Sequence, residues 1–217
     1  LPIYVRVVVG TRAAAYAPVP DLGLVAWWDD GDDLHQEPRS PYPHVRQVLT
    51  ARADLAGAAL LVGGLTMSTD TAALVGAGRL PAVRLVDMGQ QPRNTQLAPQ
   101  LMAAIGARIA RGEQAMLLLN RRGYAPVTVC RACGEQIACQ QCDARMVEHR
   151  FQKRLVCHQC GATKPIPVAC PSCGVEGRMT ALGPGVERLA EEAALAWPEA
   201  RVAILSSDLA TSAAALK

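Results

Sequence analysis

Residues 130–142 read CRACGEQIACQQC and residues 157–173 read CHQCGATKPIPVACPSC, and these two stretches hold all eight cysteines of the chain. The cysteines form four C-x-x-C pairs, separated by five, fourteen and nine residues. A two-residue gap lets one tight turn direct both sulfur atoms at a single ion, and closed four-cysteine sites usually hold structural zinc. The sequence therefore predicts two zinc sites with the ligands Cys130, Cys133, Cys139, Cys142, Cys157, Cys160, Cys170 and Cys173.

The residue after each pair supports this prediction. Glycine follows three pairs, as Gly134, Gly161 and Gly174, and Asp143 follows the fourth. Glycine adopts positive φ angles without steric cost, so the chain can turn sharply around a metal while backbone N–H groups point at the sulfur atoms. Asp143 tolerates that conformation less well.

Two other interpretations of the cysteines fit the sequence less well. Disulfides need an oxidising compartment, and the opening residues LPIYVRVVVGT are too short and wrongly flanked for a secretory signal. Iron–sulfur clusters usually use a different run of cysteines. The chain lacks an initiator methionine, so we expect a fragment. Four pairs can be joined into two sites in three ways, and the spacing alone does not choose among them.

Composition sets bounds on the rest of the chain. With 217 residues, half of them apolar, it can form one α/β body plus a small metal module. The formal charge of +3 counts cysteines as neutral; eight thiolates and two zinc ions change it by −8 and +4, to 3 − 4 = −1. An overall basic charge is therefore no argument for nucleic-acid binding. No apolar run reaches the roughly 18 residues of a membrane span, so we expect none.

Strands and helices alternate on both sides of the cysteines. Apolar or β-branched runs predict strands at 4–9, 22–28, 60–62, 83–88, 114–119 and 201–205. Helical spacing and caps predict helices at 44–55, 68–77, 97–111 and 186–197. This alternation predicts an α/β sheet protein with a metal insertion rather than an array of zinc fingers.

An acidic cluster, Asp29, Asp30, Asp32 and Asp33, follows the strand at 22–28. Carboxylates at the C-terminal end of a parallel strand are well placed to bind a metal or the magnesium of a nucleotide. A solvated acidic loop gives the same pattern, and the sequence leaves both readings open.

Three segments together resemble the PriA family of bacterial primosomal replication-restart proteins. They are VVVGTRAAAYAPVPDLGLV from residue 7, LLLNRRGYAPVTVCRACG from residue 117, and LGPGVERLAEE from residue 182, joined to the full cysteine spacing. The family consists of superfamily-two DNA helicases with two RecA-like lobes and a zinc domain inserted into the second. The resemblance covers essentially the whole chain. It implies the end of lobe 1 at 1–96, the start of lobe 2 at 97–129, the zinc insertion at 130–178, and the continuation of lobe 2 at 179–217.

The family also implies how the cysteines are paired. Its zinc sites are nested, so one would use Cys130, Cys133, Cys170 and Cys173, and the other Cys139, Cys142, Cys157 and Cys160. Both zinc ions would be structural, and the metal-free module would be largely disordered.

The chain departs from the family at its ATPase motifs. The family's Asp-Glu-Glu-His box aligns with Trp28, Asp29, Asp30 and Gly31, so the first acid is tryptophan and the second is one methylene shorter than glutamate. The family's Gly-Ser-Ala-Thr-Pro-Ser is GGLTMS at 63–68, and its Gly-x-Gly-Thr-Glu is GPGVE at 183–187. No G-x4-G-K-[ST] loop is present, and in the family it would lie upstream. No catalytic residue is assigned, and binding of ATP with Mg²⁺ stays undecided.

The resemblance implies a DNA-binding replication-restart protein whose ATPase motifs are degenerate. Its partners would be forked or single-stranded DNA, primosome components, the replicative helicase and single-stranded-DNA-binding protein, and it would be cytoplasmic and associated with the bacterial nucleoid. Candidate phosphate contacts are Arg121, Arg122, Arg150, Lys153 and Arg154. A solvated hairpin, or arginines that brace the zinc module, would explain the same residues.

Two rival functions remain open on the sequence. The first is an active ATP-dependent 3′–5′ DNA helicase in which Asp29 and Asp30 replace the usual acids. The second is a zinc-ribbon protein-interaction module without affinity for DNA.

Overall fold

The computed structural model describes residues 5–64, 66–80, 86, 90–91, 95–150 and 152–206. Within these residues the chain forms two compact units. One unit is built from the chain up to Asn120 together with the chain from Ala190 onward, and the other is Arg121–Leu189. Among the described residues, no helix has the length and apolar character that a membrane crossing requires.

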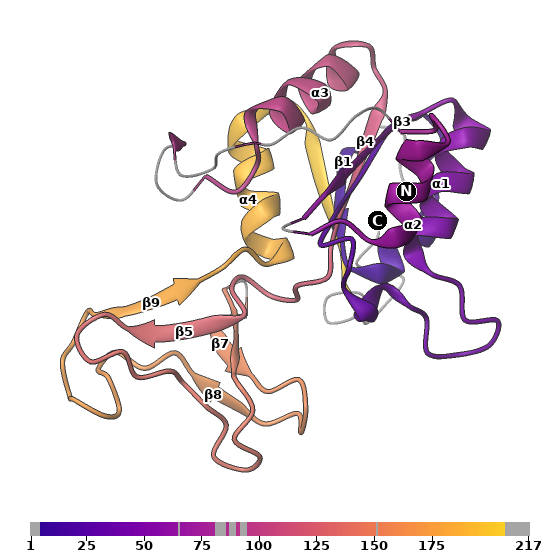
Figure 1. The fold of residues 1–217 in the computed structure, drawn as a ribbon. Helices are drawn as coiled ribbons and strands as arrows, with labels where there is room; N and C mark the ends of the chain where they lie inside the picture. The colour runs from indigo at the N-terminus through magenta and orange to yellow at the C-terminus, as the bar shows by residue number, and fades with distance from the viewer. Residues whose placement is uncertain are drawn as a thin grey trace. The chain divides into compact units, whose positions relative to one another are not determined.

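The first unit is built on a parallel sheet of five strands in the order β10-β1-β4-β2-β3 (Figure 1). The strands are β1 (Val5–Gly10), β2 (Leu22–Trp28), β3 (Ala59–Gly63), β4 (Gln114–Leu119) and β10 (Arg201–Leu205). The side chains of β4 are all buried, and those of β1 and β2 nearly all. Such runs are typical of strands covered on both faces of a parallel sheet. The sheet and its α/β setting therefore agree with the predicted fold class.

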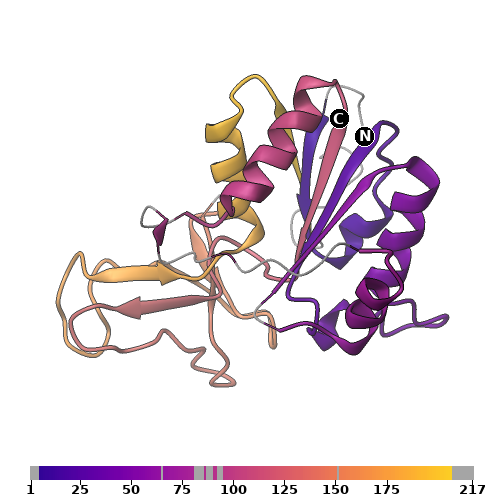
Figure 2. The same ribbon diagram turned by 45° about the horizontal axis from the view of Figure 1, so that its top comes forward.

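Helices cover both faces of this sheet, as the two views in Figures 1 and 2 show. Helices α1 and α2 lie on one side, and α3 and the part of α4 from Ala190 onward lie on the other. The bounds are α1 (Val45–Ala56), α2 (Thr69–Gly76), α3 (Pro99–Ala110) and α4 (Val186–Ala196), with short 3-10 helices η1 (Arg12–Tyr16) and η2 (Asp33–His35). The main core packs η1 and α1 against β1, β2 and β4 through residues such as Val8, Val25, Leu49 and Met116.

Local signals place the helix ends close to where the sequence predicts them. At α2, the Ser68 hydroxyl accepts a hydrogen bond from the Thr71 N–H at 3.1 Å, so Ser68 is the N-cap. At α1, His44 and Gln47 form a capping box, and Gly57 ends the helix with a φ of 63°. The strand expected at 83–88 lies, apart from residue 86, outside the described residues.

The second unit consists of short antiparallel strands. One ribbon pairs β5 (Val127–Cys130) with β9 (Met179–Leu182), and a three-stranded sheet joins β6 (Val147–His149), β7 (Arg154–Val156) and β8 (Thr163–Pro165). Its small core contains Ile137, Met146 and Leu155 together with Cys139 and Cys157. So small a core leaves most of the stabilisation to the cysteine clusters.

Strands from both of the expected helicase lobes share one sheet here. Strand β4, from the segment expected to open lobe 2, lies between β1 and β2 from the segment expected in lobe 1. The lobe boundaries at 96, 129 and 178 stay a prediction.

Candidate metal centres and the edge of the parallel sheet

The four C-x-x-C pairs adopt one repeated backbone turn. In each turn, the N–H of the first cysteine donates to the carbonyl five residues later, and its carbonyl accepts from the N–H four residues later, at 2.8–3.0 Å. In the turn that begins at Cys130, for example, the partners are the Glu135 carbonyl and the Gly134 N–H, both at 2.8 Å. This closed turn points both sulfur atoms of a pair to the same side.

The residue after each pair has a positive φ angle in all four turns. The values are 79° at Gly134, 79° at Gly161, 71° at Gly174 and 56° at Asp143. A Cβ atom added to any of the three glycines would meet nothing within 4 Å, so their requirement is one of backbone conformation and not of space. Asp143 shows that the turn tolerates a short polar residue there.

The turns bring the eight sulfur atoms together in two groups of four. One group is Cys130, Cys133, Cys170 and Cys173, and the other is Cys139, Cys142, Cys157 and Cys160; within each, the ligand atoms all lie within 4.8 Å of one another. This is the nested arrangement that the family resemblance implies. None of the eight cysteines forms a disulfide.

The geometry of both groups fits zinc. The Sγ atoms of Cys130 and Cys173 lie 3.8 Å apart, and those of Cys139 and Cys160 lie 3.5 Å apart. Four sulfurs at about 2.3 Å from a central ion would lie about 3.8 Å from each other, which is close to these distances. Backbone N–H groups of Ala132 and Gln141 also donate to the sulfurs of Cys130 and Cys139 at 3.4 Å. Each cluster can therefore hold one structural zinc ion, and the role of the individual cysteines as ligands stays a prediction.

Backbone N–H groups lower the pKa of one thiol in each cluster. The backbone N–H of Cys160 lowers the pKa of Cys157 to about 6, and that of Cys133 lowers the pKa of Cys130 to about 7. Although the backbone N–H of Ala144 acts to lower it, the sulfur of Cys157 and burial raise the pKa of Cys142 to about 12. Because the thiolate is the form that binds a metal, metal binding at these clusters depends on pH.

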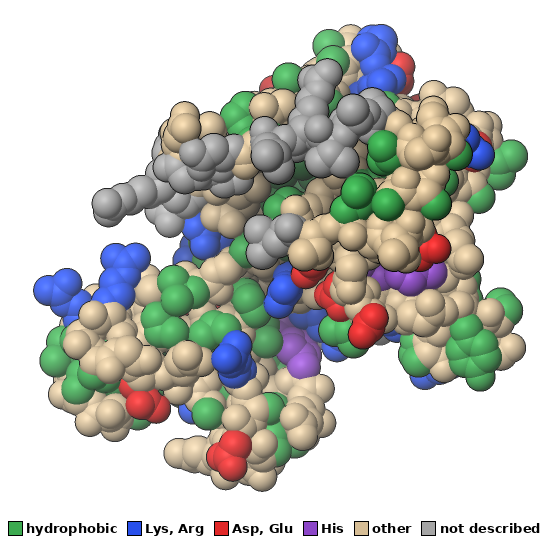
Figure 3. Space-filling model, in the orientation of Figure 1, with side chains coloured by type: hydrophobic (Ala, Val, Ile, Leu, Met, Phe, Trp, Pro, Cys, Tyr) green, Lys and Arg blue, Asp and Glu red, His purple; other side chains and the backbone are tan. Residues whose placement is uncertain are grey.

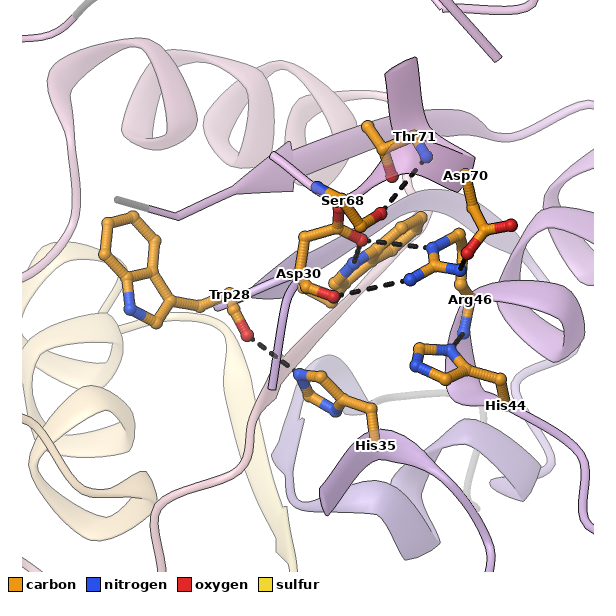
Figure 4. A network of polar contacts seen from close by, with 9 residues as sticks. Trp28, Asp30, His35, His44, Arg46, Ser68, Asp70 and Thr71 are labelled. Carbon is orange, nitrogen blue, oxygen red and sulfur yellow. Dashed lines mark hydrogen bonds and ion pairs between the residues drawn. The ribbon is translucent and has the colours of Figure 1, made fainter. Parts of the chain in front are cut away.

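The segment aligned with the ATPase box lies at the C-terminal end of β2, and Asp30 is its most buried acid (Figure 4). Oxygen Oδ1 of Asp30 accepts from Arg46 Nε at 3.1 Å and from Trp27 Nε1 at 3.3 Å. Its Oδ2 accepts from the Ser68 N–H at 2.9 Å. Asp30 thereby ties the end of β2 to α1 and to the start of α2.

Electrostatics keeps this carboxylate charged. Burial acts to raise the pKa of Asp30, but hydrogen bonds from Ser68 and Arg46 outweigh it and hold the pKa well below its usual range. Both oxygens already accept hydrogen bonds from the protein. Asp30 is thus built as an internal anchor.

The other three residues of the aligned box, Trp28, Asp29 and Gly31, are more exposed than Asp30. Trp28 is 42% exposed, and its side chain points away from the Asp30 network (Figure 4). Its carbonyl contacts His35 Nε2 at 3.0 Å, and its ring packs so closely on Gly63 that a Cβ there would lie 2.8 Å from Trp28 Cε3. Asp29 has a φ of 66°, and its N–H donates to the Gly63 carbonyl at 2.8 Å. Gly31 is exposed.

All five candidate phosphate contacts lie in the second unit and are exposed. The guanidinium of Arg150 stacks 3.5 Å from the centroid of the Tyr124 ring. Lys153 and Arg154 belong to the hairpin of β6 and β7, where Arg154 Nε donates to Gln152. Figure 3 shows Lys and Arg side chains scattered among apolar and acidic ones on the visible face. Their role in DNA binding stays a prediction.

Sequence reasoning missed several residues that organise these sites. Tyr124, His149 and Glu187 are buried, and each joins segments of the second unit that lie far apart in the sequence. His149 directly precedes Arg150 in the sequence, whereas its partner Glu187 lies 38 residues away. No local pattern marks such a pair.

Comparison with known proteins places these features in a family. A model of the "PriA DNA helicase Cys-rich region (CRR) domain" matches residues 139–165. Replication restart protein PriA of Rickettsia prowazekii is 34% identical over 220 residues, covering 94% of this chain and 34% of that protein. PriA of Bacillus subtilis is 34% identical over 221 residues, covering 94% and 27%. The probable replication restart protein PriA of Mycobacterium tuberculosis is 33% identical over 225 residues, covering 94% and 34%.

The family model covers only residues 139–165, whereas the similarity to the relatives covers 94% of the chain. The similarity therefore extends well beyond the cysteines on both sides. The chain spans about one third of the length of these relatives, or less. It is therefore a homologue of the replication restart protein PriA and contains that family's Cys-rich region.

Proposed function

We propose that this chain belongs to a replication-restart protein that binds forked or single-stranded DNA and helps to reload the replicative helicase, and whose ATPase motifs are degenerate. The observation that carries the proposal is the similarity to PriA proteins over 94% of the chain. Primosome components and single-stranded-DNA-binding protein are the partners that such a role requires. A cytoplasmic, nucleoid-associated location is part of the same proposal.

The degenerate box supports the second half of the proposal. In a working ATPase, carboxylates at this edge of the sheet must reach magnesium and the attacking water. Here the first position is Trp28, and the carboxylate of Asp30 is 1% exposed with both oxygens accepting protein donors. Only Asp29 of the box retains a partly exposed carboxylate, on a backbone turned into the left-handed region.

Arg150 is the best-placed candidate for contact with DNA. Its stacking on Tyr124 holds the guanidinium plane in a fixed orientation, while about half of the side chain stays exposed. Glu148 Oε1 forms an ion pair with Arg150 Nε at 3.7 Å, which leaves the arginine side chain about half exposed. A pre-oriented, partly exposed guanidinium suits phosphate, which it can bind with two parallel hydrogen bonds.

The test uses the full-length protein that contains this chain, loaded with zinc. Binding to a forked oligonucleotide is measured at several salt concentrations, beside ATP hydrolysis with and without the fork. We expect binding that weakens as salt rises, and no DNA-stimulated hydrolysis. Arg150→Ala should lower the salt slope by about 0.7–0.9, the value for one lost phosphate contact, whereas Lys164→Ala in the same unit serves as the charge-matched control.

One observation favours a second candidate function. The matching family model is described as part of a DNA helicase, so an active ATP-dependent 3′–5′ helicase is the alternative. DNA-stimulated hydrolysis that is abolished by Asp29→Asn would establish it and overturn the degenerate reading. Absence of any salt-dependent DNA binding would instead favour a zinc-ribbon module that binds only proteins.

A further inference from the structure

A chain of three polar side chains, two of them buried and the third exposed, runs next to the second cysteine cluster. Nδ1 of His149 lies 3.2 Å from Glu187 Oε1, and Nε2 of His149 lies 3.0 Å from His158 Nε2. His149 is 1% exposed and Glu187 is fully buried. His158 is the residue after Cys157, inside a C-x-x-C turn of the cluster. None of these three residues is a predicted metal ligand.

With Glu187 ionised, the chemistry of the three groups assigns the direction of these hydrogen bonds. A carboxylate only accepts, so the Nδ1–H of His149 donates to Glu187. This leaves the lone pair of His149 Nε2 to accept from the Nε2–H of His158. The ring centroids lie 5.1 Å apart, as expected when two imidazoles meet end to end in a direct hydrogen bond. A carboxylate commonly fixes the tautomer of a histidine that ligates a metal, and Glu187 holds His149 in the same way, although His149 is not itself a predicted ligand.

Backbone hydrogen bonds hold Glu187 firmly in place. The Glu187 N–H donates to the Gly123 carbonyl at 3.0 Å, and the Gly185 N–H donates to the Tyr124 carbonyl at 2.9 Å. The approach is so close that a Cβ on Gly185 would lie 2.2 Å from the Gly123 carbonyl oxygen. The first turn of α4 therefore packs closely against residues 123–124.

Residues 124–125 are in turn hydrogen-bonded to β6, the strand that carries His149. The Tyr124 N–H donates to the Glu148 carbonyl at 2.6 Å, and the Glu148 N–H donates to the Ala125 carbonyl at 3.1 Å. His149 thus lies between two structures of the second unit: the turn at Cys157–Cys160 and the first turn of α4. Burying a carboxylate and an imidazole is costly unless the two groups hydrogen-bond to each other, so the arrangement of Glu187 and His149 is well defined.

We propose that His149 is a positioning residue for the cluster of Cys139, Cys142, Cys157 and Cys160, held in place by Glu187, so that metal binding at this cluster is coupled to order in the first turn of α4. His149 acts on the cluster through His158, which fixes the turn between Cys157 and Cys160. The coupling is reciprocal: whatever loosens the Glu187 end weakens metal retention, and loss of the metal loosens the Glu187 end. The other cluster has no part in it.

The test measures zinc release from the full chain to a chelator in excess, with both clusters loaded. His149→Gln should release one of the two zinc ions at least about fivefold faster and leave the other unchanged. Glu187→Leu should do the same, whereas Glu187→Gln keeps an acceptor oxygen for Nδ1–H and should restore most of the retention. The double variant His149→Gln, Glu187→Leu should release zinc no faster than the faster single variant, because both changes break one chain of hydrogen bonds.

Amide hydrogen exchange identifies the cluster and the far end. In His149→Gln, protection should fall at Cys157 and Gly161 and at Gly185 and Glu187, while Cys130 and Gly134 keep theirs. Thr128→Val is the control. It removes a buried hydroxyl that makes no hydrogen bond within the described residues, and Thr128 lies in the same unit but near the other cluster. Equal acceleration of both zinc ions, or unchanged release of both, would overturn the proposal, and so would fast release without loss of protection at Glu187.

Discussion

Replacing Asp30 by alanine should destabilise the α/β unit strongly. The change removes the acceptor of three donors: Arg46 Nε, Trp27 Nε1 and the Ser68 N–H. Removing one partner of a buried ion pair costs about 3–5 kcal/mol. Each buried N–H left unpaired costs about 1–3 kcal/mol more. Arg46 retains Asp70 at 2.7 Å, which offsets part of this cost, so we expect a total of about 3–5 kcal/mol.

Asp70 provides a matched control because it binds the same arginine. The Arg46–Asp70 distance of 2.7 Å is shorter than the 3.1 Å of Arg46–Asp30, but the Asp70 side chain is 71% exposed and that of Asp30 only 1%. Exposed ion pairs contribute about 0–1 kcal/mol, so Asp70→Ala should cost less than about 1 kcal/mol. Urea unfolding of the zinc-loaded chain, followed by tryptophan fluorescence, measures both. If Asp70→Ala costs as much as Asp30→Ala, burial is not what gives Asp30 its importance, and the anchor assignment is wrong.

Three further predictions concern pH, the metal turns and metal removal. The pKa of Asp30 is lowered in the folded chain, so its contribution to stability is complete above its unfolded pKa near 3.9 and is lost as pH falls toward its folded pKa. The difference in unfolding free energy between wild type and Asp30→Ala should therefore shrink from pH 6 to pH 3. A constant difference would contradict the assignment of a charged Asp30. Gly161→Ala, at a φ of 79°, should lower the stability of the zinc-loaded second unit by about 1–2 kcal/mol, whereas Asp143→Gly, at 56°, should raise it, as measured by thermal unfolding at fixed zinc. Removing zinc with a chelator should abolish protected amides in residues 121–189 but leave those of β1, β2 and β4 protected, and equal loss in both units would contradict the view that the clusters stabilise the second unit alone.

The strands of the sheet were the most predictable part of the molecule. Strands β2, β4 and β10 have the predicted bounds, and β1 ends one residue later than predicted, while residue 4, where it was expected to begin, lies outside the described residues. These segments are encoded locally, because a strand buried on both faces must be a continuous apolar run. The strand order is not encoded in this way: β4 lies between β1 and β2 although a long stretch of chain separates them, and no periodicity reports which neighbour a strand selects.

The second unit was predictable in its chemistry but not in its strands. Strands β6, β7 and β8 have three residues each, too short for an alternating pattern to appear. Their positions follow from the metal turns, in which each cysteine pair fixes a bend and the next residues pair across it. Spacing therefore predicts the turns, whereas the nested grouping needed the family resemblance, since it depends on contacts between residues 130–133 and 170–173.

The fate of the ATPase box shows why residue identity alone is a weak guide to chemistry. Read from the sequence, Asp30 looks like a retained acid of the box, and Trp28 looks like the loss that matters. In the structure, Asp30 accepts hydrogen bonds from Arg46 and Ser68, so the acid that is present is already used to join α1 and α2 to the sheet. Restoring an acid at position 28 would therefore supply one carboxylate beside Asp29 but would not free Asp30. Recovery of hydrolysis would also require Arg46 and the start of α2 to release it, at the cost in stability estimated above for Asp30→Ala.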